Sequence, residues 1–506
     1  MNQIYKKSRR NKMKKIISLI LALLMIASSV IMMVACGGGD TEIEETKNPV
    51  SDETDDESGK RMHNVPKKDF EGEVFNSLCF KANTATYYYF TDEEAAGDPI
   101  KEALWQRTEL IEEHLNCDLT ADMRESNESE RISMMLYDQV IAGTDDWQQA
   151  LSHVITGVSS LVNNGQSYDF GKLPNVDLNA EWWDLDDMED LRLNSMYTYG
   201  RSDFMISAPH AVVFNKTMAD DLNLDNIYDL VNEKKWTVDT MSAMAKAAIV
   251  DANNDGKYMP FTDTYGIALS EISKFNSFLI ACDQPISQKN AEGRLEIVLN
   301  TEKTVKIVEK FYDLWTTNGA VYVGAMNLGY GLNHEQLFGE GRALFVIHDL
   351  SILESFREYD IDYGIAPYPK YDEEQAEYRS MDWGPMWSIP ATITNPELVG
   401  SVVELYSYFS ADTIVPAYYD KLLEGKLAQD YETRKMLELI FESVSFDPVN
   451  NYFGFHSGIG DLAFAIGKLV IEGNSKNFAS FYKGRANSAA NTLNEFYKNL
   501  EKNGRL

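Results

Sequence analysis

The chain has 506 residues, of which 46 are Lys or Arg and 79 are Asp or Glu, so its formal net charge is -33. This length excludes a mini-protein, and so acidic a chain disfavours nucleic acid, whose phosphates need a basic partner. Four cysteines in so long a chain exclude a disulfide scaffold, and 44% hydrophobic residues exclude wholesale disorder.

The N-terminal segment has the pattern of an export signal. Residues 6–15 carry seven positive charges and no negative one, and residues 16–35 carry no charge at all. A basic region followed by an apolar run is typical of a signal peptide. The run ends in MVACG, which resembles a bacterial lipobox except that Met33 stands where Leu is usual. We therefore predict a lipoprotein signal peptide over 1–35 and lipidation of Cys36, with a single membrane-spanning helix as the alternative.

Residues 36–66 follow as the lipidated Cys and an acidic tether. The stretch from Gly37 to Lys60 holds nine acidic side chains and almost no bulky apolar ones. Such a composition cannot bury enough apolar surface to fold, so we predict a disordered segment. A lipid and a flexible tether would hold the folded part at the cell membrane, on the side that faces away from the cytoplasm.

The first folded segments alternate between strands and helices. Apolar runs predict strands at Glu73–Phe80, Cys117–Met123 and Gln149–Ile155. Between them, a helix begins at Asp98-Pro99, where Asp can act as the N-cap and Pro suits the first position, and a second helix is predicted at Ile132–Ala142. This alternation indicates a parallel sheet with helices on both faces.

The remaining segments continue the α/β pattern. We predict further elements at Val305–Trp315 (helix), Ala343–Ile347 and Asp362–Ala366 (strands), and Pro396–Ser410, Thr433–Val444 and Asn487–Leu500 (helices). No internal repeat and no Pro-rich linker divides the folded part. One α/β unit of two intertwined lobes therefore fits better than separate domains in a row.

No catalytic motif stands out. The sequence contains no Gly-x-Ser-x-Gly turn, no His-Glu-x-x-His helix and no Walker phosphate loop, and its seven histidines are scattered. Carboxylates are so numerous that a glycosidase-like pair is not excluded by counting. An enzyme therefore stays open as an alternative without a residue to support it.

One acidic loop has half of a calcium-binding pattern. Asp251, Asn253 and Asp255 offer oxygen ligands at alternate positions, and Gly256 stands at the sixth position, where EF-hand loops turn sharply. The twelfth position is Thr262 and not the usual bidentate Glu. The loop is thus either a partial site for structural calcium or a polar turn after a helix.

Aromatic residues in predicted loops indicate carbohydrate binding, because Trp and Tyr rings pack on the flat C–H faces of sugars. Tyr87 and Tyr88 follow the first predicted strand, where α/β sheets place ligand loops. Trp147 precedes the third strand, and Trp383 and Trp387 share another loop. For each of these rings, ordinary packing in the core is the alternative.

Two of the remaining cysteines lie on strands that would be neighbours in a parallel sheet. Cys79 and Cys117 could form a disulfide, but two buried thiols are the favoured interpretation.

Several stretches, taken in their order along the chain, resemble one protein family. They are Ala103–Asn116, Leu178–Asp184, Val213–Asp221, Lys235–Ala248, Asp251–Lys257, Tyr265–Ile267, Phe338–Phe345, Tyr363–Lys370 and Pro416–Ser443. In this order they resemble the extracellular solute-binding lipoproteins of ABC importers, in the sugar-binding family 1 related to maltose-binding protein. The likeness covers the mature chain from about Phe70 to Leu500, and no signature for one particular sugar is present.

The resemblance implies a two-lobed α/β fold of the periplasmic-binding-protein type II, with a hinge and a ligand cleft between the lobes. Lobe one would comprise residues 67–208 plus 372–425, and lobe two residues 209–371 plus 426–506. The lobes would close around a ligand, and a membrane permease would recognise the closed form.

The same resemblance implies that ligand contacts come from loops at strand ends. The candidate ligand-binding residues are Tyr87, Tyr88, Asp146, Trp147, His153, Lys274, Phe275, His348, Asp349, Trp383 and Trp387. The predicted protein is a monomer that requires no cofactor, binds a carbohydrate and delivers it to an ABC permease. A cell-surface carbohydrate-active enzyme, the same fold with a peptide or other solute, and a scaffold lipoprotein are the alternatives.

Overall fold

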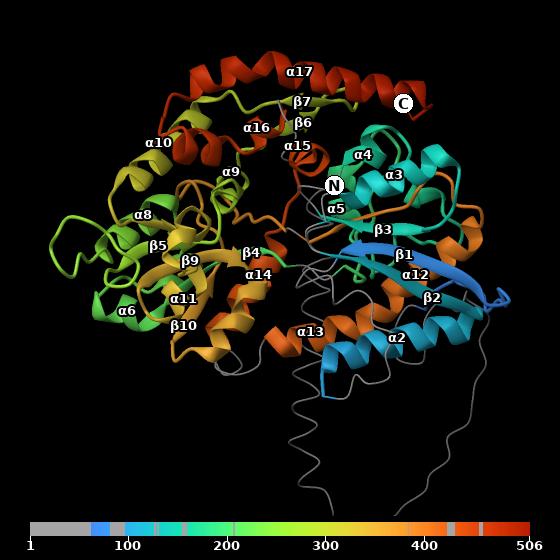
Figure 1. Ribbon diagram of the computed structural model, residues 1–506, viewed down its shortest axis with the longest axis horizontal. Helices are drawn as coiled ribbons and strands as arrows, with labels where there is room; N and C mark the ends of the chain where they lie inside the picture. The colour runs from blue at the N-terminus through green and yellow to red at the C-terminus, as the bar shows by residue number, and fades with distance from the viewer. Residues whose placement is uncertain are drawn as a thin grey trace, which may run out of the picture.

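Figure 1 shows a computed structural model of the chain, which describes residues 62–80, 97–125, 128, 131–153, 159–205, 208–382, 384–422, 431–454 and 459–505. The predicted signal peptide, Cys36 and most of the predicted tether lie outside these residues. In the part of the chain that is described, no helix is long and apolar enough to cross a membrane.

The first sheet has four strands in the order β11-β3-β1-β2. Its strands are β1 (Glu73–Phe80), β2 (Cys117–Arg124), β3 (Gln149–Ser152) and β11 (Met386–Ser388). β1 pairs in parallel with both β2 and β3, and β11 joins β3 in the antiparallel direction. The predicted parallel arrangement of the first three strands is therefore confirmed, and a strand from much later in the chain completes the sheet.

Helices cover this sheet and complete lobe one. They are α2 (Pro99–Leu115), α3 (Ile132–Ala142), α4 (Ser159–Asn163), α5 (Leu185–Leu191), α12 (Pro396–Asp412) and α13 (Ile414–Leu422). α2 begins as predicted, because the Asp98 side chain accepts hydrogen bonds from the backbone N–H groups of Ile100 and Lys101. These bonds satisfy donors that have no partner within the first turn of a helix.

The second sheet has five strands in the order β10-β4-β9-β5-β8. Its strands are β4 (His210–Asn215), β5 (Tyr265–Leu269), β8 (Val321–Val323), β9 (Ala343–Asp349) and β10 (Tyr363–Ala366). β5 runs parallel to β8 and β9, whereas β4 is antiparallel to β9 and β10. The strands predicted at Ala343–Ile347 and Asp362–Ala366 are both present.

Shorter elements and further helices surround the second sheet. They are α6 (Lys216–Asp221), α7 (Ile227–Asn232), α8 (Val238–Ala247), a 3-10 helix η4 (Ile272–Phe275), α9 (Ser277–Ala281), a hairpin of β6 (Ser287–Lys289) and β7 (Leu295–Ile297), α10 (Glu302–Thr316), η5 (Gly324–Tyr330), α11 (His334–Gly339), η6 (Leu350–Glu358) and α14 (Tyr431–Glu442). Figure 1 shows the two sheets side by side, each with its own helices. The fold is therefore α/β with two lobes, while the residue boundaries that we gave for the lobes stay a prediction.

Three extended segments lie side by side between the two sheets. Pro209 pairs with Asp382 in the antiparallel direction, and Ser380 pairs with Val444 in the parallel direction. At the centre, the fully buried Arg201 forms an ion pair of 2.7 Å with Asp382. We call these segments (208–210, 380–382 and 443–445) the crossing segments, because they connect the lobes.

The C-terminal helices extend across both lobes. After α15 (Pro448–Phe453), α16 (Ile459–Ala463) and a π-helical turn (Ile466–Glu472), α17 (Phe478–Lys502) runs over the top of the molecule in Figure 1. Beyond its end, Asn503 donates to the carbonyl of Asn164 in lobe one at 2.7 Å, while Glu501 pairs with Arg294 of the β6–β7 hairpin at 2.6 Å. α17 therefore ties lobe one to this hairpin.

The three cysteines that the structure describes are free buried thiols. In the parallel register of β1 and β2, Cys79 lies opposite Met123, whereas Cys117 lies opposite Glu73. The two thiols thus sit at opposite ends of the strand pair, too far apart for a disulfide. The favoured interpretation of two buried thiols is confirmed.

One buried carboxylate organises the core of lobe one. The Glu404 side chain, on α12, accepts hydrogen bonds from the indole N–H groups of Trp182 (2.9 Å) and Trp183 (2.8 Å) and from the backbone N–H of Asp177 (3.3 Å). Burial raises the pKa of Glu404 to about 7 even though these donors oppose the shift. Trp182 and Trp183 are thus core residues.

Replacing Glu404 by Gln should change how stability depends on pH. The pKa of Glu404 is about 7 in the folded protein against 4.5 for the free side chain, so the folded state binds this proton more tightly. The protonated Glu404 side chain contributes fully to the stability of the fold below pH 4.5. This contribution declines by about 3 kcal/mol as pH rises to 7. Gln carries no such proton. In urea unfolding, the free energy of unfolding of the variant should therefore rise relative to that of the wild type by about that amount between roughly pH 4.5 and pH 8. A difference that is the same at every pH would contradict this account.

Candidate functional site

The candidate site lies where strands of the two sheets end and approach each other. β3 of lobe one ends at Ser152 and is followed by His153, and β5 of lobe two ends at Leu269 and leads to Glu271 and Lys274. His153 interacts electrostatically with both Glu271 and Lys274. Two strand ends from separate lobes therefore lie within electrostatic range of each other, at the kind of position where α/β sheets hold ligands.

Around Lys274 the fold gathers four of the seven histidines of the chain. We call this group the Lys274 cluster; its members are Lys274, Asp349, His153, His210, His334 and His348.

The centre of the Lys274 cluster is a buried ion pair. The Nζ atom of Lys274 lies 3.3 Å from Oδ2 of Asp349 and 3.4 Å from Nε2 of His210. Asp349 also lies 3.2 Å from Nδ1 of His348 and accepts hydrogen bonds from the backbone N–H and the hydroxyl of Ser351. Burial by itself would raise the pKa of Asp349, but His348 and Lys274 hold it well below its usual value.

Three of the histidines are held in the neutral form at pH 7. Burial, followed by the charge of Lys274, lowers the pKa of His210 well below its ordinary value, and the Nδ1 atom of His210 lies 2.8 Å from the hydroxyl of Ser277. Burial also lowers the pKa of His153 to about 4 and that of His334 to about 3. The rings of His334 and His348 stack with their centroids 5.3 Å apart. These three neutral imidazoles therefore lie near one ammonium group, that of Lys274.

Several buried polar atoms near these strand ends have no hydrogen-bond partner among the residues that the structure describes. They are the hydroxyls of Ser152, Ser270 and Ser273 and the Nε2 atom of His334. A buried polar group without a partner costs on the order of 1–3 kcal/mol, so native proteins rarely leave several in one place. A ligand with its own hydroxyl groups would supply the missing partners.

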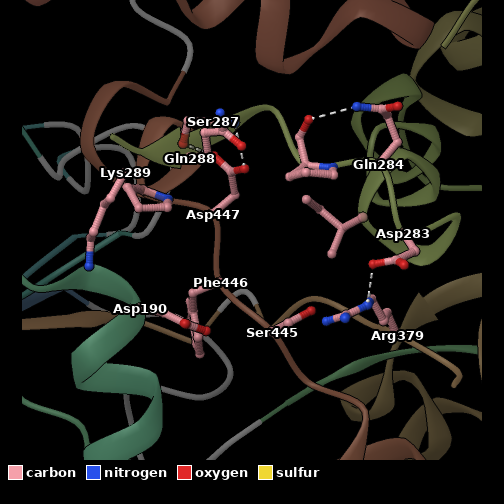
Figure 2. Close-up of a pocket in the computed structure, with 13 residues that line it drawn as sticks. Asp190, Asp283, Gln284, Ser287, Gln288, Lys289, Arg379, Ser445, Phe446 and Asp447 are labelled. Carbon is pink, nitrogen blue, oxygen red and sulfur yellow. Dashed lines mark hydrogen bonds and ion pairs between the residues drawn. The ribbon is translucent and has the colours of Figure 1, made fainter. Parts of the chain in front are cut away.

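A cavity of about 340 Å³ opens one short helix away from the cluster. Ser277, at the start of α9, contacts His210 of the cluster, and Ile280, near the end of α9, lines the cavity. Figure 2 shows Lys289 and Asp190 on one side of this cavity and Asp283 and Arg379 on the other. Its walls therefore come from α5 of lobe one, from the α9–β6 region of lobe two, and from the chain next to the crossing segments.

Polar contacts fix the walls of the cavity. The Nε atom of Arg379 lies 2.7 Å from Oδ1 of Asp283, as Figure 2 shows. Lys289, on β6, donates to the carbonyl of Glu189 near the end of α5 at 2.7 Å. Burial raises the pKa of Asp190, and the positive charge of Lys289 opposes that shift. The cavity is thus lined by residues of both lobes that carry charges of both signs.

Four predicted ligand residues come together in the Lys274 cluster. Lys274 pairs with Asp349, Asp349 also contacts its neighbour His348, and His153 lies within electrostatic range of Lys274. That they contact a ligand stays a prediction, and it enters the proposal below.

Two predicted ligand residues belong to the core. Trp387 has no exposed surface, stacks on Trp183 at 5.9 Å between ring centroids, and donates its indole N–H to Gln149 at 2.7 Å. Phe275 is 2% exposed and packs edge-on against Phe311. The prediction that Trp387 forms a stacking platform is therefore wrong, and Phe275 has no free face for a ligand.

Asp146 and Trp147 lie at the opposite edge of the first sheet from His153. Both precede β3, and the backbone carbonyl of Asp146 accepts a hydrogen bond from the side chain of Asn76, which lies in the first half of β1. This is the edge at which the parallel strands begin, whereas His153 lies at the edge where β3 ends. The fold therefore separates Asp146 and Trp147 from His153, and a ligand contact of Asp146 or Trp147 stays a prediction.

Three predicted aromatic contacts are outside the described residues. They are Tyr87, Tyr88 and Trp383. Their roles stay predictions.

The loop with the calcium pattern closes on its own backbone. The carboxylate of Asp251 accepts from the backbone N–H groups of Asp255 (3.3 Å) and Gly256 (2.8 Å). The side-chain oxygen of Asn253 also accepts from the backbone N–H of Asp255 (3.0 Å). Within the described ranges, no group of three or more His, Cys, Asp or Glu side chains could hold a metal ion. The loop thus forms a polar turn by itself, and calcium binding at Asp251, Asn253 and Asp255 stays a prediction.

Sequence reasoning missed His210, His334 and the hydroxyls of Ser152 and Ser270. His210 begins an apolar strand and His334 begins a short helix, and neither has a second histidine at ligand spacing. Serine is too common to be singled out in a sequence. The only signal was their place at the predicted ends of strands, and such a signal applies to many residues.

Replacing Asp447 by Ala should destabilise the wall of the cavity. The buried Asp447 side chain accepts from the N–H groups of Ile286 (2.8 Å), Ser287 (2.9 Å) and Val449 (3.0 Å) and from the Ser287 hydroxyl (2.8 Å). Several donors would be left buried without a partner, so the free energy of unfolding should fall by about 3 kcal/mol or more. Gln288→Ala, in the same lining but exposed, is the control and should stay within about 0.5 kcal/mol of the wild type. Equal unfolding free energies for the two variants in denaturant titrations would refute this role.

Comparisons with known proteins find similarity only at the level of structure. No protein-family model matches the sequence, and no curated protein sequence matches it. Among solved structures, the ABC transporter solute-binding protein from Agrobacterium radiobacter K84 in complex with ribitol aligns with a TM-score of 0.54 at 13% identity. The alignment covers 83% of this chain and 98% of that one.

Two further structures agree in fold. The ABC substrate-binding protein from Listeria monocytogenes in complex with cycloalternan has a TM-score of 0.51 at 13% identity, over 86% of this chain and 100% of that one. The maltose/maltodextrin-binding domain from Bdellovibrio bacteriovorus bound to maltotriose also has a TM-score of 0.51 at 13% identity, with coverages of 86% and 100%. All three similar chains are binding proteins. Their structural similarity to this chain confirms, at the level of the fold, the family resemblance that the sequence suggests. The protein therefore has the two-lobed fold of the sugar-binding proteins of ABC transporters.

Proposed function

We propose that this protein is the substrate-binding component of an ABC importer and that it captures a carbohydrate, in particular an oligosaccharide, between its lobes. The observation that carries the proposal is the shared two-lobed fold, because structures with this fold hold ribitol, cycloalternan and maltotriose. The protein binds its sugar without chemical change. In support of this, the sequence has no recognisable catalytic motif and the similar structures are those of binding proteins.

Closure of the lobes is the proposed mechanism. Lobe one comprises residues 67–208 plus 372–425, lobe two comprises 209–371 plus 426–506, and the crossing segments act as the hinge. A ligand that contacts both lobes stabilises the closed form, because its contacts are complete only there. The electrostatic interaction of His153 in lobe one with Lys274 in lobe two supports this mechanism, because it shows that charges of the two lobes lie near each other.

The proposed ligand contacts are His153, Lys274, His348 and Asp349, together with the hydroxyls of Ser152, Ser270 and Ser273, which have no partner in the described part of the chain. Hydroxyl groups of a sugar can both donate to and accept from serine and imidazole groups. Because these groups are buried, a ligand that fits poorly leaves one of them without a hydrogen-bond partner, which costs binding free energy. Burial therefore makes binding more selective. Tyr87, Tyr88 and Trp383 remain proposed stacking contacts.

Cys36 is the proposed site of a lipid that holds the protein at the outer side of the cell membrane. The acidic tether gives the folded lobes freedom to reach a permease in the same membrane. The permease would take the sugar from the closed form, and a monomer is sufficient for this role.

Binding of the right sugar should raise the melting temperature of the purified mature protein. A ligand that binds only the folded state stabilises it by about 2.7 kcal/mol at a hundred times its Kd. The measurement is a thermal scan against a panel of mono- and oligosaccharides, followed by chromatography of the recovered sugar. Recovery of a cleaved sugar would identify an enzyme, and a rise with peptides alone would overturn the carbohydrate assignment.

Replacing Cys36 by Ser should release the protein from the membrane. The thiol is the only group at this position that can carry the lipid, and a single membrane-spanning helix would not depend on it. We expect the variant in the soluble fraction and the wild type in the membrane fraction of cells. Membrane retention of Cys36→Ser, with residues 1–35 still attached, would favour the spanning helix instead.

A further inference from the structure

The cavity of Figure 2 lies outside the Lys274 cluster, and its charged side chains are not all paired within it. On one side, Asp283 and Arg379 form an ion pair of 2.7 Å. The buried carboxylate of Asp447 accepts four hydrogen bonds from its own wall. Among the described residues that line the cavity, Lys289 and Asp190 are the remaining charged ones.

Lys289 and Asp190 attract each other without touching. Figure 2 shows both on the same side of the cavity, and both keep exposed surface. Each lies within electrostatic range of the other, yet in the described part of the chain no ion pair joins them. The Nζ atom of Lys289 donates to the backbone carbonyl of Glu189 at 2.7 Å, and the carboxylate of Asp190 accepts from the backbone N–H of Phe446. An ammonium has three donors and a carboxylate about four acceptor sites, so both groups keep capacity for a ligand.

The cavity keeps part of the water away from both charges. Burial raises the pKa of Asp190 and lowers the pKa of Lys289, and the charge of each residue opposes the shift of the other. A charge that is held away from water without a direct counter-ion is costly. A ligand that places an anion beside Lys289 and a cation beside Asp190 would relieve both costs.

This pair of charges selects the class of ligand. A neutral sugar supplies no counter-charge for either group, and a ligand with a single charge would match one group and repel the other. A small zwitterion matches both. Ile280, Phe446 and Pro448 line the same cavity and offer apolar surface to the rest of such a ligand. The cavity volume of about 340 Å³ lies at the lower end of the roughly 300–1,000 Å³ that small-molecule sites occupy.

We propose that this cavity is a second ligand site, which binds a free α-amino acid independently of the proposed carbohydrate function. The Nζ atom of Lys289 donates to the α-carboxylate, and the carboxylate of Asp190 accepts from the α-ammonium. Both are charge-assisted hydrogen bonds, which are about twice as strong as neutral ones. Asp190 belongs to α5 of lobe one and Lys289 to β6, beside lobe two. The bound amino acid therefore contacts both lobes.

Ligands that lack one charge test this site on the mature protein. Calorimetry first measures binding of the common α-amino acids. The tightest binder is then compared with its amide, which lacks the carboxylate, and with its N-acetyl form, which lacks the ammonium. We expect the amino acid to bind at least ten-fold more tightly than both analogues, because each analogue leaves one charge unmatched. Absence of binding by every amino acid at millimolar concentration would overturn the proposal, and so would an analogue that binds as tightly as the amino acid.

Two variants assign the two charges. Lys289→Met should weaken binding of the amino acid at least ten-fold and abolish its advantage over the amide. Asp190→Asn should weaken it as much and abolish its advantage over the N-acetyl form. Structural damage would instead weaken all three ligands alike. Asp118→Asn, which removes an exposed carboxylate on β2, is the matched control and should bind like the wild type. Binding that neither cavity variant weakens would overturn the proposal. If a variant fails to fold, the comparison of analogues on the wild type still decides the question.

The panel of sugars keeps this site apart from the proposed function. If a sugar raises the melting temperature and no amino acid binds, the amino-acid site alone is overturned. If an amino acid binds through Lys289 and Asp190 and no sugar binds, the carbohydrate function is overturned and the amino-acid site stands.

Discussion

The ion pair between Arg201 and Asp382 is the contact on which the arrangement of the two lobes depends. Arg201 belongs to lobe one and is fully buried, and Asp382 lies in the middle crossing segment. The same carboxylate accepts from the backbone N–H of Ala208, in the first crossing segment, and the guanidinium lies 4.9 Å from the ring centre of Phe446, just after the third. Removal of one partner from such a pair would leave a buried charge, which typically costs about 3–5 kcal/mol. One pair thus holds all three connections between the lobes.

The position of the site follows from this arrangement. His210 is the last residue of the first crossing segment and the first residue of β4. The segment that joins the lobes therefore also places an imidazole ring next to Lys274. On the far side of α9, the third crossing segment continues into Phe446 and Asp447, which line the cavity of Figure 2. A change in the angle between the lobes would therefore move the cluster and the cavity together. This coupling is what a protein needs if closure is to depend on an occupant between the lobes.

The aromatic residues show how far a sequence can mislead about a sugar site. Trp387 looks exposed in the sequence, because it lies in a short segment rich in turns, yet β11 adds to the edge of β3 and buries the ring against Trp183. The decisive step is the pairing of residues 150–152 with 386–388, which is separated by more than two hundred positions in the chain. Local patterns carry no information about such a pairing, whereas they do report the short-range periodicity of strands and helices.

The sequence by itself determined the alternation of strands and helices, the cap of α2 at Asp98, the buried state of the cysteines and, through the order of its motifs, the two-lobed fold. These features depend on local periodicity, on capping chemistry and on the run of segments along the chain. Only the tertiary structure decided that His153, His210, His334 and His348 meet at Lys274, and that Asp146 and Trp147 lie at the other edge of the sheet. The physical reason is that a site between two lobes is made by strand ends far apart in sequence. Their meeting depends on the pairing of the sheets and on the contacts of the crossing segments.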